Sequence, residues 1–440
     1  MKKEINTKPL SGFMELKPGE QILFNKMKNI IEENYKLFGF IPMDNPQIER
    51  KEILFAKAGG EIKTQIYDLQ KGDDDLALRY DLTVPLARYV ADKYGELAFP
   101  FKRYQIAKVY RGERPQAGRF REFYQADIDV IGDGELSLDF DAEVIAVAVK
   151  IFNEWKEIFP KLGDSLTKIN SRKLFDGLFE FLKIQEKTIE LMQEIDRLDK
   201  IGENGVKENL EKLDIAVEKI EKIFEFLKAK SFDDIENLNI QNETFKTGVM
   251  ELKTVVDNLK ALGVDEKYYE INTSIARGHA YYTGVINELS LVDYPEFGTV
   301  SAGGRYENLA SEYIDKKMPG TGTSVGLSRL FDQLLKNGVI ETEEKTYSKI
   351  LILPMTENEK EFALDLVLKI RAEKISAEVD LRFDKKMAKR AKYAEKLKIP
   401  FVLFLGEDEV QSQKFSLKNF QTGEKIEDLD LEKLVKILKD

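Results

Sequence analysis

The spacing of apolar and polar residues divides the first part of the chain into two regions. In residues 19–37, apolar side chains from Ile22 to Ile31 recur at helical spacing, which predicts an amphipathic helix. The prolines of GFIPMDNP end it and mark extended chain. Residues 52–160 are rich in Tyr, Phe, Val and Ile, a composition typical of strands.

The pattern changes twice more. Residues 171–262 predict long charged helices, such as EKTIELMQEIDRL, with loop breaks at Gly202 and Gly205. Strand signals return at 269–305, followed by a glycine-rich turn and a helix. The stretch ETEEKTYSK is typical of a linker. Beyond it, apolar strands (ILILP, FVLFLG) alternate with amphipathic helices (EKEFALDLVLKIRAEK, KMAKRAKYAEKLK), which predicts an α/β unit.

Two candidate strands carry polar side chains at every second residue. These are Arg79, Asp81 and Thr83 in LRYDLTVPLARY, and Gln125, Asp127 and Asp129 in FREFYQADIDVIG. A period of two puts each trio on one face of a sheet. A solvent-facing strand explains either trio alone. The sharper interpretation is a cleft floor that offers carboxylates, an amide and a hydroxyl to a small cationic ligand such as an amino acid.

Between these strands, KVYRGERPQAGRFREF predicts a strand–loop–strand hairpin. Its cations are Lys108, Arg111, Arg114, Arg119 and Arg121. Guanidinium groups bind phosphate oxygens in pairs, so the hairpin suits a polyphosphate or a nucleic-acid end, with Phe123 placed to stack on a base. A solvated charged hairpin is the alternative.

The segment MPGTGTSVGLSRLF has glycines that match neither a dinucleotide fingerprint nor a phosphate-binding loop. Glycine allows close packing where a strand meets a helix. Arg329 falls in the first turns of that helix, either as a buried structural arginine or as a cation for a terminal phosphate.

Composition narrows the class of protein. With 42% hydrophobic and 33% charged residues, the chain predicts an ordinary globular protein of two or three domains. It has no cysteine and one histidine, so disulfides and thiolate metal sites are excluded and the composition argues against a zinc site. The start lacks the apolar core of a secretory signal and no run has the length of a membrane span, so we expect a soluble cytoplasmic protein without a membrane partner. The net charge of −11 argues against uniform basic coating, but residues 385–398 hold seven Lys/Arg against one Glu.

Together these segments resemble the histidyl-tRNA synthetases, a class II aminoacyl-tRNA synthetase family, over almost the whole chain. GFMELKPGEQ and GFIPMDNP resemble the start of the family and its motif 1, which implies a homodimer. RYDLTVPLARY resembles a histidine-binding strand, YRGERPQAGRFREFYQADID motif 2 and GTGTSVGLSRLF motif 3. ARGHAYYTG and SAGGRYENL resemble the two signatures of the histidine enzymes, and the C-terminal unit resembles their anticodon-binding domain.

The resemblance implies an α+β catalytic domain built on an antiparallel sheet, residues 1–335. It implies a helical insertion domain at 171–262, a linker at 336–347 and a C-terminal α/β anticodon-binding domain at 348–440. The expected enzyme activates L-histidine with ATP to histidyl-adenylate and pyrophosphate, then transfers histidine to the 3′-terminal adenosine of histidine tRNA.

By the same resemblance, Arg111 and Arg277 hold the α-phosphate and are the expected catalytic residues. Arg329 meets the γ-phosphate, Glu113 contacts the adenine or its loop, and Phe123 stacks on the adenine. Mg2+ is expected on the outer phosphates, with no metal site built from protein ligands alone.

For the amino acid, the implied binding residues are Asp81, Thr83, Gln125, Asp129, Arg277, Tyr281 and Tyr282. The first three would fix the α-amino group, and Asp129 and Tyr282 would hydrogen-bond the two imidazole nitrogens. Asp129 stands where some members have Glu, so its reach is shorter by one methylene.

One signature departs from the family. The usual RGLDYY reads RGHAYY here, so His279 and Ala280 replace Leu and Asp. We expect His279 to be a packed structural residue; a general base in the transfer step is the alternative.

For tRNA, Gln116 at the hairpin tip is a candidate contact with the acceptor end. The basic helix of the C-terminal unit offers Lys389, Arg390 and Lys392 to a phosphate backbone; a solvated helix face is the alternative.

Two other functions remain open. Some relatives of this family are non-catalytic regulatory subunits of ATP phosphoribosyltransferase, which keep the fold, lack the anticodon domain and lose the arginines. A synthetase-like enzyme acting on another acceptor is the second. The presence of Arg111, Arg277, Arg329 and the C-terminal domain favours the ligase.

Overall fold

The computed structural model describes residues 5–56, 60–114, 118–276, 282–308, 310–342 and 345–439. Contacts divide the chain into two compact units. One comprises Met1–Glu15 and Met27–Ile340, and the other comprises Leu16–Lys26 and Glu341–Asp440. Each unit is described by itself. No helix within the described ranges is long and apolar enough to cross a membrane.

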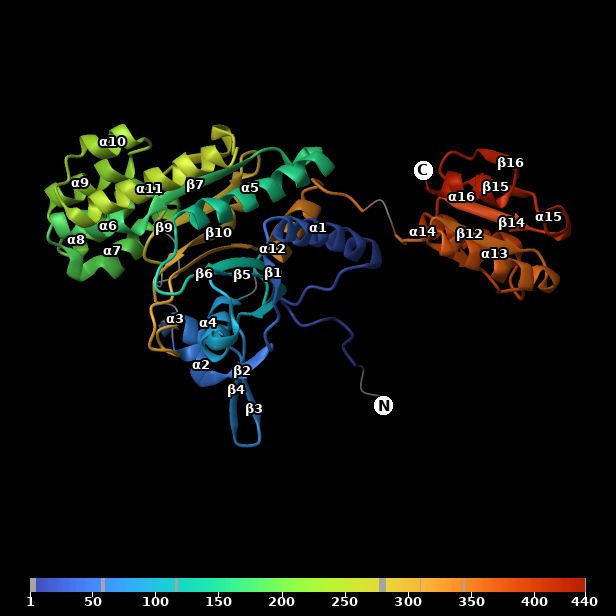
Figure 1. The fold of residues 1–440 in the computed structure, drawn as a ribbon, viewed down its shortest axis with the longest axis horizontal. Coiled ribbons are helices and arrows are strands. Elements are labelled where there is room, and N and C mark those ends of the chain that lie inside the picture. Colours follow the sequence, from blue (N-terminus) through green and yellow to red (C-terminus); the bar gives the residue numbers. More distant parts are fainter. Residues whose placement is uncertain are drawn as a thin grey trace. The chain divides into compact units, whose positions relative to one another are not determined.

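An eight-stranded sheet forms the centre of the first unit in its described part (Figure 1). The strands are, in spatial order, β1 (Ile41–Pro42), β5 (Phe101–Tyr110), β6 (Glu122–Ile131), β11 (Gly320–Val325), β10 (Thr299–Tyr306), β9 (Val285–Leu291), β7 (Ser165–Ser171) and β8 (Tyr269–Ile271). Only the outer pairs, β1 with β5 and β7 with β8, are parallel. The predicted antiparallel sheet of a class II catalytic domain is therefore confirmed.

Helices and a small sheet cover the large sheet. They are α1 (Pro18–Leu37), α2 (Lys51–Phe55), α3 (Gly60–Gln65), α4 (Thr83–Asp92), α5 (Asp139–Ile158), α12 (Leu327–Lys336) and the sheet of β2 (Ile48–Arg50), β4 (Asp74–Leu78) and β3 (Asp68–Lys71). Figure 1 shows α5 on one side of the strands and α2, α3 and α4 on the other. The polar trio of β6 faces the α4 side, because Arg103, the register partner of Asp129, donates a hydrogen bond to Leu82 O just before α4.

The prediction of a strand at residues 79–83 was wrong. β4 ends at Leu78 and α4 begins at Thr83. Asp81 Oδ1 accepts hydrogen bonds from Thr83 N (3.2 Å) and Val84 N (2.9 Å), so it satisfies amides of the first helical turn. Pro85 is tolerated there because its missing N–H belongs to the turn whose amides have no helical acceptor. Arg79, assigned to the same polar face, is buried and donates to backbone carbonyls.

Two further sequence interpretations need correction. The region 52–160 is not mainly strand, since it contains α2, α3, α4 and the 20-residue α5. The segment GTGTSV, expected as a turn, is the strand β11. The two glycines lower the strand propensity of this segment, but pairing with β6 and β10 on both sides holds it extended.

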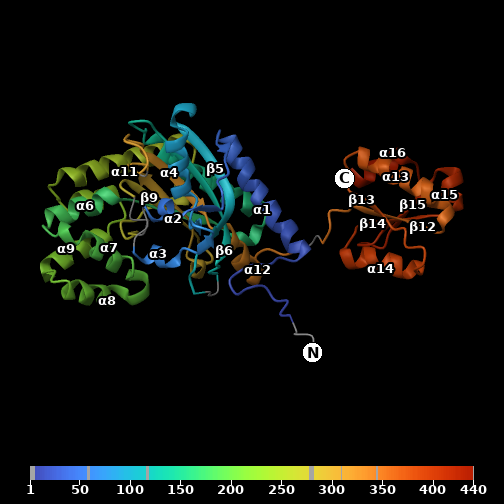
Figure 2. The same cartoon turned by 90° about the horizontal axis from the view of Figure 1, so that it is seen from below.

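The predicted charged helices are α6 (Arg172–Phe181), α7 (Thr188–Ile195), α8 (Leu198–Lys212), α9 (Val217–Leu227), α10 (Phe232–Asn237) and α11 (Glu243–Ala261). Figure 2 shows α6 to α9 grouped beside the sheet. Edge-to-face contacts of Phe226 with Phe175 (5.1 Å) and Phe245 (6.1 Å) join α9 to α6 and α11. Gly202, with φ 70°, interrupts α8 as predicted, whereas Gly205 lies inside the helix and does not.

In the second unit, the predicted strands and helices are confirmed. A five-stranded sheet runs β13 (Ala377–Val379), β12 (Ile350–Pro354), β14 (Phe401–Leu405), β15 (Phe415–Asn419) and β16 (Lys425–Leu429). Its helices are α13 (Lys360–Ala372), α14 (Met387–Leu397), α15 (Glu407–Ser412) and α16 (Leu431–Lys439). Ile350 and Ile352 pack with α13 and α16, while Leu351 and Leu353 pack with α14. The alternation of β12 therefore separates two helix layers.

Candidate active site

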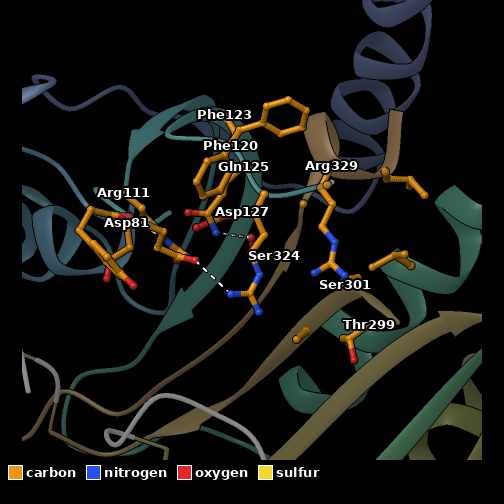
Figure 3. A pocket seen from close by; sticks show the side chains of 18 of the residues that line it. Asp81, Arg111, Phe120, Phe123, Gln125, Asp127, Thr299, Ser301, Ser324 and Arg329 are labelled. Carbon is orange, nitrogen blue, oxygen red and sulfur yellow. Dashed lines mark hydrogen bonds and ion pairs between the residues drawn. The ribbon is translucent and has the colours of Figure 1, made fainter. Parts of the chain in front are cut away.

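A cavity of about 640 Å³ opens between β6, β10, β11 and the segments before α4 and α12 (Figure 3). We call it the larger cavity. Eight of the predicted site residues line it: Asp81, Thr83, Arg111, Glu113, Phe123, Gln125, Tyr282 and Arg329. They come from segments up to about 250 positions apart in the chain, and the fold brings them to one place.

A smaller cavity of about 20 Å³ adjoins the larger one at the floor. Asp129 lines only this smaller cavity, together with Tyr306 and Gly322. Five residues line both: Thr83, Asp127, Tyr282, Ala302 and Ser324. The predicted carboxylate of Asp129 therefore lies deeper than the other candidate ligands.

Arg111 is held between two aromatic rings at one wall of the larger cavity. Its guanidinium carbon lies 4.4 Å from the ring centre of Tyr80 and 5.1 Å from that of Phe123, and its Nε donates to Tyr80 O at 3.3 Å. Tyr80 OH in turn donates to Gln65 Oε1 (3.0 Å), and Gln65 O accepts from Gly112 N (2.6 Å). Sequence reasoning missed Tyr80 and Gln65, which hold the predicted catalytic arginine by contacts from distant segments.

Arg329 projects from α12 at the opposite wall, as Figure 3 shows. Its Nη2 donates to Phe297 O at 2.8 Å. Arg329 is exposed, so the interpretation as a buried structural arginine was wrong; one of its nitrogens is anchored on the backbone while the side chain lines the cavity.

The hairpin cations divide by position. Of the described ones, only Arg111 and Arg119 line the larger cavity. Lys108 pairs with Glu122 at 2.7 Å, and Arg121 donates to Glu113 O at 3.1 Å. Lys108 and Arg121 therefore stabilise the hairpin itself rather than face the cavity.

A buried ion pair closes the floor. Asp129 Oδ2 lies 2.5 Å from Arg103 Nη2, and Asp129 Oδ1 accepts a hydrogen bond from Tyr306 OH at 2.9 Å. Burial raises the pKa of Asp129, although Arg103 opposes the shift, and burial raises the pKa of Tyr306 well above its usual value. Both carboxylate oxygens of Asp129, the residue predicted to hydrogen-bond the imidazole ring of histidine, therefore already have protein partners.

The glycines of β11 make room for this floor. A Cβ at Gly320 would lie 2.3 Å from the Tyr306 ring, and a Cβ at Gly322 would lie 2.4 Å from Asp129 Oδ1. The close packing that these glycines allow lies between strands and not, as the sequence suggested, where the strand meets the helix.

Behind the floor, Arg305 of SAGGRY joins three elements. It forms a 2.6 Å ion pair with Asp141 of α5 and donates to Leu136 O and Ser137 O, while Thr321 of β11 donates to Asp141 Oδ1 at 3.0 Å. Arg305, Asp141 and Thr321 are buried and paired, so Arg305 supports the site from behind, while Ser301 and Ala302 of the same motif line the larger cavity.

Asp127 belongs to the polar trio predicted from the sequence, but no substrate contact was assigned to it. It lies between Gln125 and Asp129 on the polar face of β6. Burial raises its pKa to about 7, partly offset by Arg103 and by a hydrogen bond with Ser324.

Several predicted residues lie elsewhere. Arg277, Tyr281, His279 and Gln116 fall outside the described residues. In the second unit, Arg390 was predicted to contact the tRNA backbone from the protein surface, and this prediction was wrong because Arg390 is buried.

Arg390 is 1% exposed, donates to Pro354 O and Asp380 O, and lies 3.3 Å from the Asp380 carboxylate. Arg390 lies on the buried face of α14, so its guanidinium group contacts the interior of the unit and not solvent. Lys389 and Lys392 are exposed, as a tRNA contact requires.

Comparisons with known proteins identify the family of the chain. A family profile described as histidyl-tRNA synthetase matches residues 12–330, and one described as an anticodon binding domain matches 349–440. The histidine–tRNA ligase of Clostridium tetani is 46% identical over 450 residues, covering 100% of both chains.

Two solved structures are also similar. The crystal structure of histidyl-tRNA synthetase from Nostoc sp. PCC 7120 matches with a TM-score of 0.90 at 36% identity, covering 99% of both chains. An ATP phosphoribosyltransferase regulatory subunit/histidyl-tRNA synthetase from Bacillus halodurans matches with a TM-score of 0.76 at 20% identity, covering 92% of this chain and 99% of that one, and shows the fold alone. The chain belongs to the histidyl-tRNA synthetase family.

Proposed function

We propose that this chain is a histidine–tRNA ligase that forms histidyl-adenylate from L-histidine and ATP, then esterifies the 3′-terminal adenosine of histidine tRNA. One observation carries the proposal. A single cavity joins a carboxylate-rich floor, which suits an amino acid with a basic side chain, to walls that carry Arg111 and Arg329. Its volume of about 640 Å³ falls in the range of ligand sites.

The amino acid would occupy the floor. Asp81, Thr83 and Gln125 receive its α-ammonium group, and Asp81 is already oriented by its hydrogen bonds to the first turn of α4. The imidazole ring extends toward the smaller cavity, between Tyr282 and the carboxylates of β6. Tyr281 and Arg277 complete this set by resemblance.

ATP would occupy the rest of the larger cavity. In the first step the histidine carboxylate attacks the α-phosphorus and pyrophosphate leaves, so negative charge builds on the α-phosphate oxygens. Arg111 and Arg277 stabilise that charge, while Arg329 holds the γ-phosphate. Phe123 presents a ring to the adenine, and Arg111 lies over the same ring. Glu113 forms an ion pair with Arg119 at 3.6 Å.

Mg2+ fits this site only as a companion of ATP. Among the described residues, no group of three or more potential metal ligands gathers. Mg2+ commonly binds through substrate phosphates with one or two carboxylates, so the outer phosphates would hold it. When bound, it would supply charge neutralisation on the outer phosphates.

A homodimer through motif 1 is part of the proposal. β1 is an edge strand of the large sheet, and Ile41 on it is 52% exposed. Leu37 at the end of α1 and Ile48 on β2 are also exposed. Large apolar side chains around an open sheet edge favour a partner surface. Light scattering on the native chain tests this, and a monomer at micromolar concentration would refute it.

The comparisons do not favour the regulatory-subunit alternative. The curated relatives that match the whole chain at 40–46% identity are histidine–tRNA ligases, whereas the match with a regulatory title is 20% identical. The C-terminal unit matches the anticodon binding profile over 349–440. We further expect the enzyme in the cytoplasm, where its tRNA is used.

The deciding experiment is ATP–pyrophosphate exchange with each of the twenty amino acids, followed by charging of tRNA. We expect exchange with histidine alone and charging of histidine tRNA. Exchange without charging would favour an enzyme with another acceptor, and no histidine-dependent exchange would favour a regulatory protein.

A further inference from the structure

One buried carboxylate at the junction of the two cavities has no role in the account given so far. Asp127 lines both cavities, whereas Asp129 lines only the smaller one. Asp127 is 3% exposed and shares the polar face of β6 with Gln125 and Asp129. A ligand that extends from the larger cavity into the smaller one therefore passes Asp127, which Figure 3 labels among the residues that line the larger cavity.

Hydrogen-bond partners distinguish the two carboxylates. Asp129 is engaged on both oxygens, by Arg103 and by Tyr306. Asp127 Oδ1 is buried, and no residue in the described ranges donates a hydrogen bond to it. The nearby amide of Gln125 donates instead to Ser324 Oγ at 2.9 Å. A buried carboxylate oxygen without a donor costs stability, which a donor on the ligand would recover.

The surrounding charge leaves Asp127 available. Arg103 is 0% exposed, and its Nη2 is committed to Asp129 and to Leu82 O. Its attraction lowers the pKa of Asp127, but burial outweighs it and raises that pKa to about 7. Arg103 thus neutralises the deeper carboxylate directly and the shallower one only through space.

We propose that Asp127 determines side-chain specificity by accepting, through Oδ1, an N–H of the imidazole ring of bound histidine. Asp129 is then a positioning residue, which acts through Arg103 and Tyr306 to hold the floor. This inference rests on the proposed function and names a contact within it. It also accounts for the short reach of Asp129, because the ring need not touch it.

The chemistry sets the specificity. A carboxylate only accepts hydrogen bonds, and imidazole donates from one ring nitrogen when neutral and from both when protonated. An amino acid of similar shape without that N–H would leave Oδ1 desolvated and unpaired. Sites built around a required donor discriminate against its absence by about 10⁴-fold or more.

Titration calorimetry of L-histidine and the two thiazolylalanine isomers tests the contact, since in each isomer sulfur replaces one ring nitrogen and the remaining nitrogen carries no hydrogen, so neither has a ring N–H to donate. The proteins are the native full-length chain, Asp127→Ala, Asp127→Asn and, as the matched control on the same face, Asp129→Asn. We expect Asp127→Ala to weaken histidine by roughly 100-fold. The affinities of both isomers should change less than about 3-fold, because neither donates a ring N–H to Asp127, so discrimination between histidine and the isomers collapses.

Three results would overturn the proposal. Histidine affinity could survive Asp127→Ala, all ligands could weaken equally, as a contact with the shared α-ammonium group would produce, or discrimination could collapse in Asp129→Asn alone. Asp127→Asn keeps the volume but removes the charge and replaces one acceptor oxygen with an NH2 donor. If the alanine variant does not fold, weaker histidine affinity in Asp127→Asn supports the contact and unchanged affinity opposes it. Histidine-dependent exchange by the native chain is measured alongside. If it is absent, the proposed function fails; if it is present while the Asp127 variants bind histidine normally, only this inference fails.

Discussion

Arg390 and its neighbours on α14 allow a structural role to be separated from a tRNA contact. The perturbation is Arg390→Met, which keeps much of the volume and removes the guanidinium. Arg390 donates to Pro354 O at 2.8 Å and to Asp380 O. The Asp380 carboxylate would keep a partner, because Arg382 Nε contacts it at 3.0 and 3.1 Å. The loss is therefore two buried carbonyls rather than an isolated charge.

Each such carbonyl left without a donor costs about 1–3 kcal/mol, so the free energy of unfolding of the second unit should fall by about 2–6 kcal/mol. For a unit of this size, that lowers Tm by at least about 8 °C. Differential scanning calorimetry of the full chain gives the value.

The control variant is the double substitution Lys389→Glu and Lys392→Glu on the exposed face of the same helix. Surface changes of this kind alter stability by less than about 0.5 kcal/mol. Affinity for histidine tRNA should fall at least about 10-fold at low salt, with a shallower dependence on salt concentration. An unchanged Tm in Arg390→Met would refute the anchoring role, and unchanged tRNA affinity in the double variant would refute the contact surface.

Three further outcomes follow from the site. Tyr80→Leu should lower kcat of histidine-dependent exchange about 10-fold, because the Arg111 guanidinium loses its stacking ring, with Tyr80→Phe close to native; equal effects of both would contradict the stacking argument. Gly322→Ala should abolish exchange or destabilise the fold, because its Cβ would fall 2.4 Å from Asp129 Oδ1; native Tm and activity together would refute this. Burial raises the pKa of Asp127 to about 7, from about 3.9 in the unfolded chain, so its contribution to stability is full below pH about 4 and is lost as pH rises through about 7. Asp127→Asn stays neutral, so denaturant unfolding should show its stability relative to the native chain rising between pH 5 and 8, and a constant difference would contradict the shift.

The predictions that succeeded rest on long, local patterns. β6 is ten residues long, so its alternation of polar and apolar positions identified Gln125 and Asp129 as neighbours on one face. The amphipathic helices and apolar strands of the second unit were equally clear, because each repeats its period several times.

The failures came from short patterns and distant partners. At Asp81 and Thr83 an alternation of three residues fits a strand, but the Asp81 carboxylate satisfies the start of a helix. Arg390 was misassigned because its partners Pro354 and Asp380 are reached only through the fold. The role of Tyr80 was invisible for the same reason, since its ring meets an arginine 31 positions away.

The glycines of β11 limit how this site could be redesigned. Gly320 and Gly322 already have the smallest possible side chain, and the space they leave is filled by the Tyr306 ring and the Asp129 carboxylate. Gly303 on β10 is equally constrained, with its Cβ position 2.1 Å from Gly322 O. Acceptance of bulkier unnatural amino acids therefore cannot be engineered by trimming these strands. It would require shortening Tyr306 itself, at the cost of the hydrogen bond that holds the floor.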